Sequence, residues 1–260
     1  MNYTINFLKT KNSFMFKASF FILCFASCIF YACSSSKRQS ASGQTNMLTQ
    51  KEKNNGWVLL FDGATTNGWH SYNKNSVTKN WKVQDGAIVM DPKLKDDNNA
   101  GDIVTNNEYK NYEFATDWKI SEGGNSGIIF DIKEDPKFRD TYNTGAEMQV
   151  LDNIKADDNK KENHLAGLLY DMHGTAALSK PKPAGEWNQA RIIQNNGHLT
   201  FYFNGIKTVD VQEGSAEWKN MIANSKFKTW TNFMTSPNGR IAFQDHGHEV
   251  AFRNVKIRTL

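Results

Sequence analysis

The chain has 260 residues, with 31 Lys and Arg against 27 Asp and Glu and a sequence pI near 8.8. Three of the basic residues, Lys9, Lys11 and Lys17, lie in an N-terminal segment without acids, so the rest of the chain is almost neutral. No basic stripe follows, which argues against nucleic acid as a partner. The length is sufficient for one sizeable domain with its own core.

Residues 1–32 have the pattern of an export signal. The three lysines precede an uncharged apolar run that ends at Ala32 and is too short to span a bilayer comfortably. Ala32, Cys33 and the polar residues after them resemble a bacterial lipoprotein cleavage site, so Cys33 is predicted to carry a lipid anchor in the membrane. Cys28 is a second candidate, and an uncleaved membrane anchor is the alternative. We expect a cell-envelope lipoprotein that faces the periplasm.

The part of the chain after the signal falls into two regions. Residues 33–54 are rich in Ser, Gln, Asn and Lys, which predicts a flexible tether. Residues 55–260 are predicted to form the domain. All three cysteines precede it, so its stability must come from its core without a disulfide.

From residue 57 onward, short apolar or alternating runs are separated by Asn-Gly and Asp-Gly pairs, which are strong hairpin signals. Three hairpins are expected, and the last two runs are expected to pair around residues 245–248. One short helix is expected at 216–224. The expected strands are 57–61, 81–84, 87–90, 191–194, 198–203, 206–211, 241–244 and 249–257. This pattern predicts an all-β fold, an antiparallel two-sheet jelly-roll sandwich with little helix.

A six-residue stretch that begins at Glu147 reads Glu-Met-Gln-Val-Leu-Asp. Side chains two positions apart on a strand share a face, so Glu147 and Gln149 should point one way and Met148 and Val150 into a core. Asp152 needs a bulge or the strand end to rejoin the polar face. A carboxylate and an amide on one sheet face suit a site that binds or cleaves sugars, although a solvated strand face has the same pattern.

Aromatic residues are abundant, with 17 Phe and 7 Trp. Most of the rings are expected in the core between the sheets. Two of them are candidate platforms on which a sugar ring can stack. These are Tyr170 and Trp187, the second of which follows a Pro- and Gly-rich segment.

Four groups of segments together resemble one known family. They are Phe61-Asp62-Gly63 with Gly68-Trp69; Asn125-Ser126-Gly127-Ile128 with the stretch that begins at Glu147; Ala166-Gly167-Leu168-Leu169-Tyr170 with Gly185-Glu186-Trp187-Asn188; and Ile241-Ala242-Phe243-Gln244-Asp245-His246-Gly247 with Phe252-Arg253-Asn254-Val255-Lys256-Ile257. Their order and spacing over residues 55–260 are similar to the 3-keto-disaccharide hydrolase family. The resemblance implies a concanavalin A-like jelly roll whose concave sheet binds glucosides oxidised to a ketone at C3.

The resemblance also implies roles for single residues. A ketone at C3 acidifies the hydrogen on C2; a base removes it, the aglycone leaves C1, and water adds. Glu147 is the expected base, most effective if burial raises its pKa. His246 is expected to protonate the leaving group or to hydrogen-bond the enolate, and Asp152 to orient His246 or bind a hydroxyl. Arg253 is as readily structural as functional. The expected substrate-binding residues are Gln149, Gln244, Tyr170, Trp187 and Asn125.

The sequence assigns no cofactor, but a divalent metal stays an alternative. Two imidazoles and carboxylates gather between Asp245 and Glu249, and imidazole and carboxylate groups are good ligands for zinc or similar ions. His164 and His173 are further candidates for such a site. The spacing matches no defined ligand motif.

Two other functions stay open. The spacing of Glu147, Gln149 and Asp152 parallels the E-x-D-x-x-E motif of laminarinase-like retaining β-glucan hydrolases, with Gln for the middle Asp and Asp for the last Glu. That mechanism needs its two carboxyl groups about 5–5.5 Å apart. A non-catalytic lectin module is the second, since this fold class serves binding as readily as catalysis. The carboxylate and imidazole together favour an enzyme.

Overall fold

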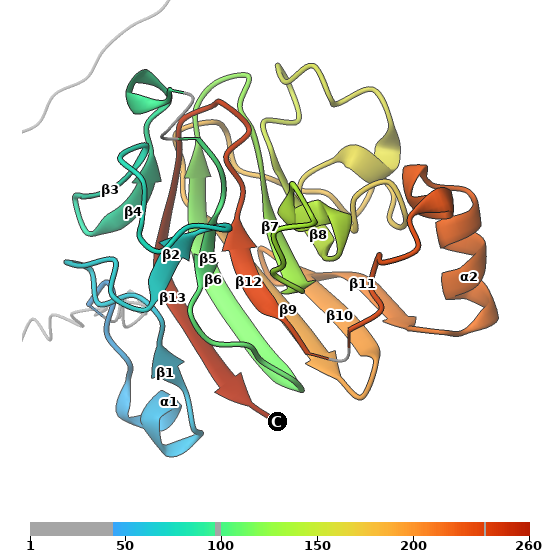
Figure 1. Ribbon diagram of the computed structural model, residues 1–260, viewed down its shortest axis with the longest axis horizontal. Helices are drawn as coiled ribbons and strands as arrows, with labels where there is room; N and C mark the ends of the chain where they lie inside the picture. Colours follow the sequence, from blue (N-terminus) through green and yellow to red (C-terminus); the bar gives the residue numbers. More distant parts are fainter. Residues whose placement is uncertain (1–43, 97–99, 237) are drawn as a thin grey trace, which may run out of the picture. The chain divides into compact units, whose positions relative to one another are not determined.

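The computed structural model of the protein describes residues 44–96, 100–236 and 238–260. In these residues two antiparallel sheets form a sandwich with two short α-helices (Figure 1), which confirms the predicted fold class. No helix within them is long and apolar enough to cross a membrane. The predicted export signal, Cys33 and the first half of the predicted tether lie outside the described residues, so the lipid anchor stays a prediction.

The larger sheet has eight strands. Seven follow the order β11-β10-β9-β6-β13-β4-β3, and β1 pairs with β13. Every neighbouring pair in it is antiparallel. The strands are β1 (Val58–Leu59), β3 (Trp81–Gln84), β4 (Ala87–Met90), β6 (Tyr112–Ile120), β9 (Asn188–Asn195), β10 (His198–Phe203), β11 (Ile206–Gln212) and β13 (Val250–Thr259).

The smaller sheet has five strands in the order β2-β5-β12-β7-β8, again antiparallel. They are β2 (Trp69–Ser71), β5 (Ile103–Thr105), β12 (Arg240–Phe243), β7 (Asn125–Ile132) and β8 (Ala146–Leu151). Beyond β8 the backbone of residues 167–170 adds further hydrogen bonds: the N–H of Gly167 and of Tyr170 donate to the carbonyls of Gln149 and Glu147. The edge of the sheet at β8 is therefore covered by chain.

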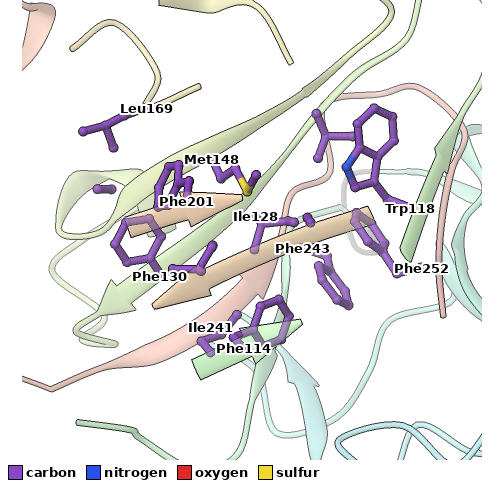
Figure 2. Close-up of a cluster of buried hydrophobic side chains, with 14 of the residues drawn as sticks. Phe114, Trp118, Ile128, Phe130, Met148, Leu169, Phe201, Ile241, Phe243 and Phe252 are labelled. Carbon is purple, nitrogen blue, oxygen red and sulfur yellow. The ribbon is translucent and has the colours of Figure 1, made fainter. Parts of the chain in front are cut away.

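The hydrophobic core lies between the two sheets, and Figure 2 shows its large side chains. Met148 of β8 is 0% exposed and belongs to this cluster, as expected from the alternation along its strand. Phe243 of β12 stacks on Phe252 of β13 with ring centroids 3.7 Å apart, which joins the two sheets. Truncating one such ring to Ala typically costs about 3–5 kcal/mol of stability.

The three predicted hairpins are confirmed as β3-β4, β9-β10 and β10-β11. Asp85, Asn196 and Asn204 each take a positive φ near 50° and precede a glycine with positive φ, which suits two-residue hairpin turns. The expected helix is α2 (Ala216–Ala223), where the Ser215 side chain accepts a hydrogen bond from the N–H of Trp218.

The expected pairing of the last two strands is wrong. β12 belongs to the smaller sheet, between β5 and β7, whereas β13 belongs to the larger sheet, between β6 and β4. The turn signal at Asp245–Glu249 is real, but the chain uses it to cross from one sheet to the other. Local turn chemistry does not distinguish a hairpin from such a crossing, because both need only a reversal of direction.

The second half of the predicted tether is ordered. Residues 50–54 form the short helix α1 (Gln50–Asn54), which begins with a capping box between Thr49 and Glu52. Asn46 is buried, donates from Nδ2 to the carbonyl of Gly86, and exchanges two hydrogen bonds with Asn254 of β13. The polar composition that predicts a tether here instead supplies caps and buried hydrogen bonds.

Candidate functional site

A cavity of 710 Å³ lies on the face of the smaller sheet that points away from the core. Six residues predicted from the sequence to be catalytic or substrate-binding line it: Asn125, Glu147, Gln149, Tyr170, Gln244 and His246. They come from β7, from β8 and from the segments that follow β8 and β12. Adjacent strands of one sheet thus bring together side chains that are far apart in the sequence.

Glu147 of β8 contributes a buried carboxyl group to the cavity, with 5% of the residue exposed. Burial raises its pKa to about 8; the Lys226 ammonium opposes this shift, and the charges of Asp102 and Asp158 add to it. Gly127 on β7 makes the position possible, since a Cβ there would lie 2.2 Å from Oε1 of Glu147. A carboxyl with such a pKa is a stronger base than an exposed one when it is ionised.

Two buried glutamines present free hydrogen-bonding atoms beside Glu147. Gln149 is 0% exposed, and its Oε1 accepts from the N–H of Val150. Among the described residues, its Nε2 and the Oε1 of Gln244 are buried without a hydrogen-bond partner. Since buried polar groups are usually paired, one free donor and one free acceptor in a cavity suit a polyhydroxylated ligand.

His246 lies in the turn after β12, lines the cavity and is exposed. Its turn is held by Asp245, whose carboxylate accepts hydrogen bonds from Asn80 Nδ2, the N–H of Gly101 and Lys95 Nζ. Burial of the ring on the cavity side lowers the pKa of His246, and the neighbouring His248 adds to this. The ring is therefore suited to act as a neutral hydrogen-bond donor near neutral pH.

Asp102 immediately precedes β5, the neighbour of β12 in the smaller sheet, and is a further buried carboxyl of the cavity that the sequence did not indicate. It accepts hydrogen bonds from Thr141 Oγ1 and, at 2.8 Å, from the N–H of Asp245. Burial raises its pKa to about 7 in spite of these bonds. Asp102 thereby links the turn that carries His246, after β12, to the start of the neighbouring strand β5.

Asp158 is also new, and it lies in the loop after β8. Its Oδ2 accepts from the Tyr170 hydroxyl at 3.0 Å and from Asn125 Nδ2 at 3.5 Å. Its Oδ1 lies 2.7 Å from Nδ1 of His164. Nothing in the polar loop sequence distinguishes Asp158 from its neighbour Asp157, so only the tertiary structure identifies it.

Lys226 is another cavity residue that the sequence did not indicate. Its Nζ lies 4.2 Å from the centre of the Tyr170 ring and 5.6 Å and 6.0 Å from those of Tyr142 and Trp230. Rings at these distances attract a cation through their negative faces. The rings therefore hold an ammonium group at the cavity.

Comparison with known proteins identifies the family. Residues 56–258 match the family described as the 3-keto-alpha-glucoside-1,2-lyase-like domain. The chain belongs to this family. A curated 3-keto-disaccharide hydrolase of Bacteroides thetaiotaomicron is 33% identical over 229 residues, which are 79% of each protein. The family membership confirms the resemblance seen in the sequence, and the chain is an enzyme.

Two solved structures, both of proteins from Parabacteroides distasonis, share the fold of this chain. Both are provisionally assigned glycosyl hydrolases. The first is 34% identical with a TM-score of 0.76 and is matched over 84% of this chain and 100% of its own. The second is 28% identical with a TM-score of 0.60, over 78% and 99% of the two chains.

Asp152 does not lie where the sequence analysis placed it. It is absent from the cavity lining, and its carboxylate instead accepts hydrogen bonds from the N–H of Gly123 at 2.8 Å and of Ile154 at 3.0 Å. The strand ends at Leu151 without a bulge that would return Asp152 to the polar face. Asp152 therefore caps a turn, and it does not form the second carboxyl of a retaining glucanase pair with Glu147.

Replacing Asp152 by Asn tests this structural role in the family enzyme. The loss of two charge-assisted bonds to backbone N–H groups is expected to lower the free energy of unfolding by about 1–3 kcal/mol. The turnover number of the folded enzyme should stay within about twofold of wild type. Urea unfolding and steady-state kinetics measure the two effects, and a large loss of turnover without loss of stability would contradict the assignment.

Trp187 is likewise not in the cavity. It packs against Ala87 and Ala251 on the outer face of the larger sheet, with Lys119 Nζ 5.0 Å and Arg253 Cζ 4.0 Å from its ring centre. The Pro- and Gly-rich segment before Trp187 therefore does not place this ring at the cavity. Arg253 is structural here, on the ring of Trp187.

The metal alternative gains no support from the described residues. No group of three or more His, Cys, Asp or Glu side chains among them could hold a metal ion. In the turn that suggested such a site, Asp245 is used by Asn80, Lys95 and the backbone, and the rings of His246 and His248 are 6.0 Å apart between centroids.

Proposed function

We propose that the protein cleaves glycosides whose glucose ring carries a ketone at C3, by elimination of the C1 substituent and addition of water. The observation that carries this proposal is a buried Glu147, with its pKa raised to about 8, in a polar cavity of a chain that is 33% identical to a 3-keto-disaccharide hydrolase. Ordinary glycoside hydrolysis does not need a base above C2. Cleavage of a 3-keto sugar does need such a base, because its reaction begins with removal of the proton from C2.

The chemistry assigns Glu147 the first step. Its carboxylate takes the proton from C2, and the electron pair of that bond moves into the enolate between C2 and C3. The enolate collapses to the ketone as the C1–O bond breaks, and a double bond forms between C1 and C2. Water then adds to C1, and C2 regains a proton from Glu147, which resets the base.

Two donors are available for the negative charge that develops on the oxygen at C3. His246 can donate a hydrogen bond as a neutral imidazole, and Lys226 offers an ammonium group held by aromatic rings. Both line the same cavity as Glu147. Preorganised donors at a developing oxyanion are often the largest contribution to such a reaction.

The free amide atoms of Gln149 and Gln244 are suited to the hydroxyl groups of the ring. A sugar that lacks those hydroxyls, or presents them on another face, would leave buried polar atoms unpaired. This supports recognition of a hexose ring rather than of an apolar aglycone. The cavity lining is consistent with recognition of a hexose ring, because β7, β8 and the segments after β8 and β12 each contribute polar side chains to it.

The direct test is substrate discrimination. Purified protein is expected to release aglycone from a 3-keto-glucoside and to leave the parent glucoside intact, because only the ketone makes the C2 proton removable. The release of a p-nitrophenyl or sugar aglycone with time, together with the 1,2-unsaturated ketone trapped by rapid quench, provides the measurement. Equal cleavage of both substrates would refute the proposal, and saturable binding without turnover would instead indicate a lectin.

A further inference from the structure

The imidazole of His164 is buried between two carboxylates. The residue is 7% exposed; its Nδ1 lies 2.7 Å from Asp158 Oδ1, and its Nε2 lies 2.8 Å from Asp171 Oδ1. A neutral imidazole has a single N–H, so it can donate to only one of these oxygens. At the other nitrogen a lone pair would face an anionic oxygen. The geometry therefore requires one proton more than a neutral ring and two carboxylates carry.

The Asp171 end of this cluster is set up to stay ionised. Asp171 also accepts hydrogen bonds from Lys161 Nζ at 3.2 Å and from the N–H of Lys226 at 2.7 Å. Burial acts to raise the pKa of Asp171, but the hydrogen bonds from His164, Lys226 and Lys161 outweigh it and hold that pKa below its usual range. The Tyr170 ring packs on the imidazole, with centroids 4.3 Å apart. The extra proton therefore belongs to the ring or to Asp158.

The Asp158 end of the cluster faces the cavity. The Asp158 side chain is 30% exposed, against 7% for that of Asp171. Its second oxygen is bound by the Tyr170 hydroxyl and by Asn125, two residues that line the cavity with it. Asp158 also lies close enough to Glu147 for its charge to raise the pKa of that base. The extra proton is thus one hydrogen bond away from a carboxylate beside the base.

We propose that Asp158 is the acid that protonates the departing oxygen at C1, and that His164 and Asp171 are positioning residues that hold and replenish its proton. This inference rests on the function proposed above. It supplies a group that His246 does not provide well, since the lowered pKa of His246 leaves that ring neutral near neutral pH. No motif in the sequence marks Asp158 for this role.

The proton balance of the cycle closes. When the C1–O bond breaks, its electron pair stays on the leaving oxygen, which takes the proton from Asp158. His164 shares its Nδ1 proton with the resulting carboxylate. In the second half, the water oxygen bonds to C1, one of its protons passes to Asp158, and C2 takes back the proton held by Glu147. The net reaction is the addition of one water across the glycosidic bond.

The experiment compares two 3-keto-glucosides that differ in the leaving group. An alkyl or sugar aglycone needs a proton to leave, whereas p-nitrophenolate leaves as an anion. Asp158→Asn is expected to lose on the order of 10²–10⁴-fold in kcat on the alkyl substrate and less than about tenfold on the p-nitrophenyl substrate. The p-nitrophenyl activity also shows that the variant is folded.

His164→Asn tests the positioning residues through pH dependence. Wild-type kcat on the alkyl substrate should fall at high pH as the cluster loses its extra proton, and this fall should move by at least about one pH unit in the variant. The p-nitrophenyl substrate should show no such fall. If His164→Asn does not fold, Asp171→Asn is measured in the same way.

A matched control is His198→Asn. His198 of β10 also faces a carboxylate, with Nε2 2.6 Å from Asp210 Oδ1, but it is exposed and outside the cavity, so both activities and the pH profile should stay unchanged. Equal losses on the two substrates in folded Asp158→Asn, or an unshifted pH profile in the His164 or Asp171 variant, would overturn this inference while the proposed function stands. Failure of wild-type protein to cleave either 3-keto-glucoside would overturn both.

Discussion

Replacing Glu147 by Gln is expected to remove nearly all turnover and, at the same time, to stabilise the fold. Loss of a positioned general base costs on the order of 10²–10⁴-fold in rate. The gain in stability arises because the cavity holds a carboxyl that cannot ionise freely: burial raises its pKa to about 8 from its ordinary value of 4.5. Gln keeps the shape of the neutral acid and has no proton to lose.

The sign of the stability effect follows from linkage. Below the unfolded pKa the carboxyl is neutral in both states and contributes nothing. Between that value and the folded pKa of about 8, the unfolded chain releases the proton while the folded chain keeps it, so rising pH favours unfolding. Glu147→Gln has no carboxyl to ionise, so its stability does not fall in this way as the pH rises. Its advantage in free energy of unfolding should be small at about pH 4 and reach roughly 1–3 kcal/mol at about pH 8.

The same ionisation should appear in the kinetics. On the p-nitrophenyl substrate, whose departure needs no acid, the kcat/KM of wild type is expected to rise with pH and level off above an apparent pKa near 8, because only the ionised carboxylate removes a C–H proton. Unfolding curves at the two pH values and a kcat/KM profile provide the measurements. A variant that is less stable than wild type at high pH, or that keeps wild-type turnover, would contradict the assignment of Glu147.

Glu113→Gln is a matched control for this substitution. Glu113 of β6 is also buried, at 3% exposure, but it lies on the larger sheet and pairs with Arg191 and Arg258. Removing its charge leaves two guanidinium groups without their partner, so stability should fall by about 1–3 kcal/mol. Turnover of the folded control should be unchanged. A gain in stability for Glu147→Gln and a loss for Glu113→Gln would distinguish the carboxyl of Glu147, whose ionisation is opposed by burial, from the carboxyl of Glu113, which is paired with two arginines.

Gly127→Ala is expected to disable the site from a neighbouring strand. The new Cβ would lie 2.2 Å from Oε1 and 2.7 Å from Cδ of Glu147, closer than atoms can approach, so the Glu147 side chain must move. Displacing a catalytic group by about 1 Å can cost on the order of 10²-fold in rate. Overpacking of this kind typically costs about 1–3 kcal/mol in stability. Steady-state kinetics and thermal unfolding measure the two losses.

A double-mutant cycle identifies the cause. If the clash is with Glu147, the stability lost in Gly127→Ala should largely disappear when Glu147 is already replaced by Ala, and the two changes will not add. Additive losses would instead place the clash in the backbone. Gly239→Ala serves as the comparison, since its Cβ would meet backbone atoms of Asp131 and Ile132 outside the cavity, and no change at Glu147 should rescue it.

The predicted hairpins and the two faces of the stretch from Glu147 agree with the structure because both depend on neighbours in the chain. Turn residues with positive φ specify their own reversal, and the two-residue period of a strand places Glu147 and Gln149 opposite Met148. Where a feature depended on a distant partner, sequence analysis was less accurate. Trp187 packs against two alanines of the larger sheet, and Asp152 accepts a hydrogen bond from the N–H of Gly123, 29 residues earlier in the chain.

The cavity residues that the sequence did not indicate are those whose environment is formed by other elements of the fold. Asp102, Asp158 and Lys226 belong to polar segments without a motif, and each becomes distinctive only in the cavity. The same carboxyl in an exposed loop would have an ordinary pKa. The pKa shifts of Glu147 and Asp102 involve groups from β8, from the residue before β5, from the loop after β8 and from the segment after α2, among them the ammonium of Lys226 and the neighbouring carboxylates.

The sequence alone determines the fold class, most of the hairpins and the family of this protein. Strand alternation, turn residues and the order of the motifs can all be read along the chain. The tertiary structure decided which acids share the cavity, which sheet each of the last two strands joins, and which way the chain turns after β8. The physical reason is that desolvation and hydrogen-bond pairing depend on what lies across space. Once a sheet has brought its strands together, the separation of two residues in the sequence says little about the distance between their side chains.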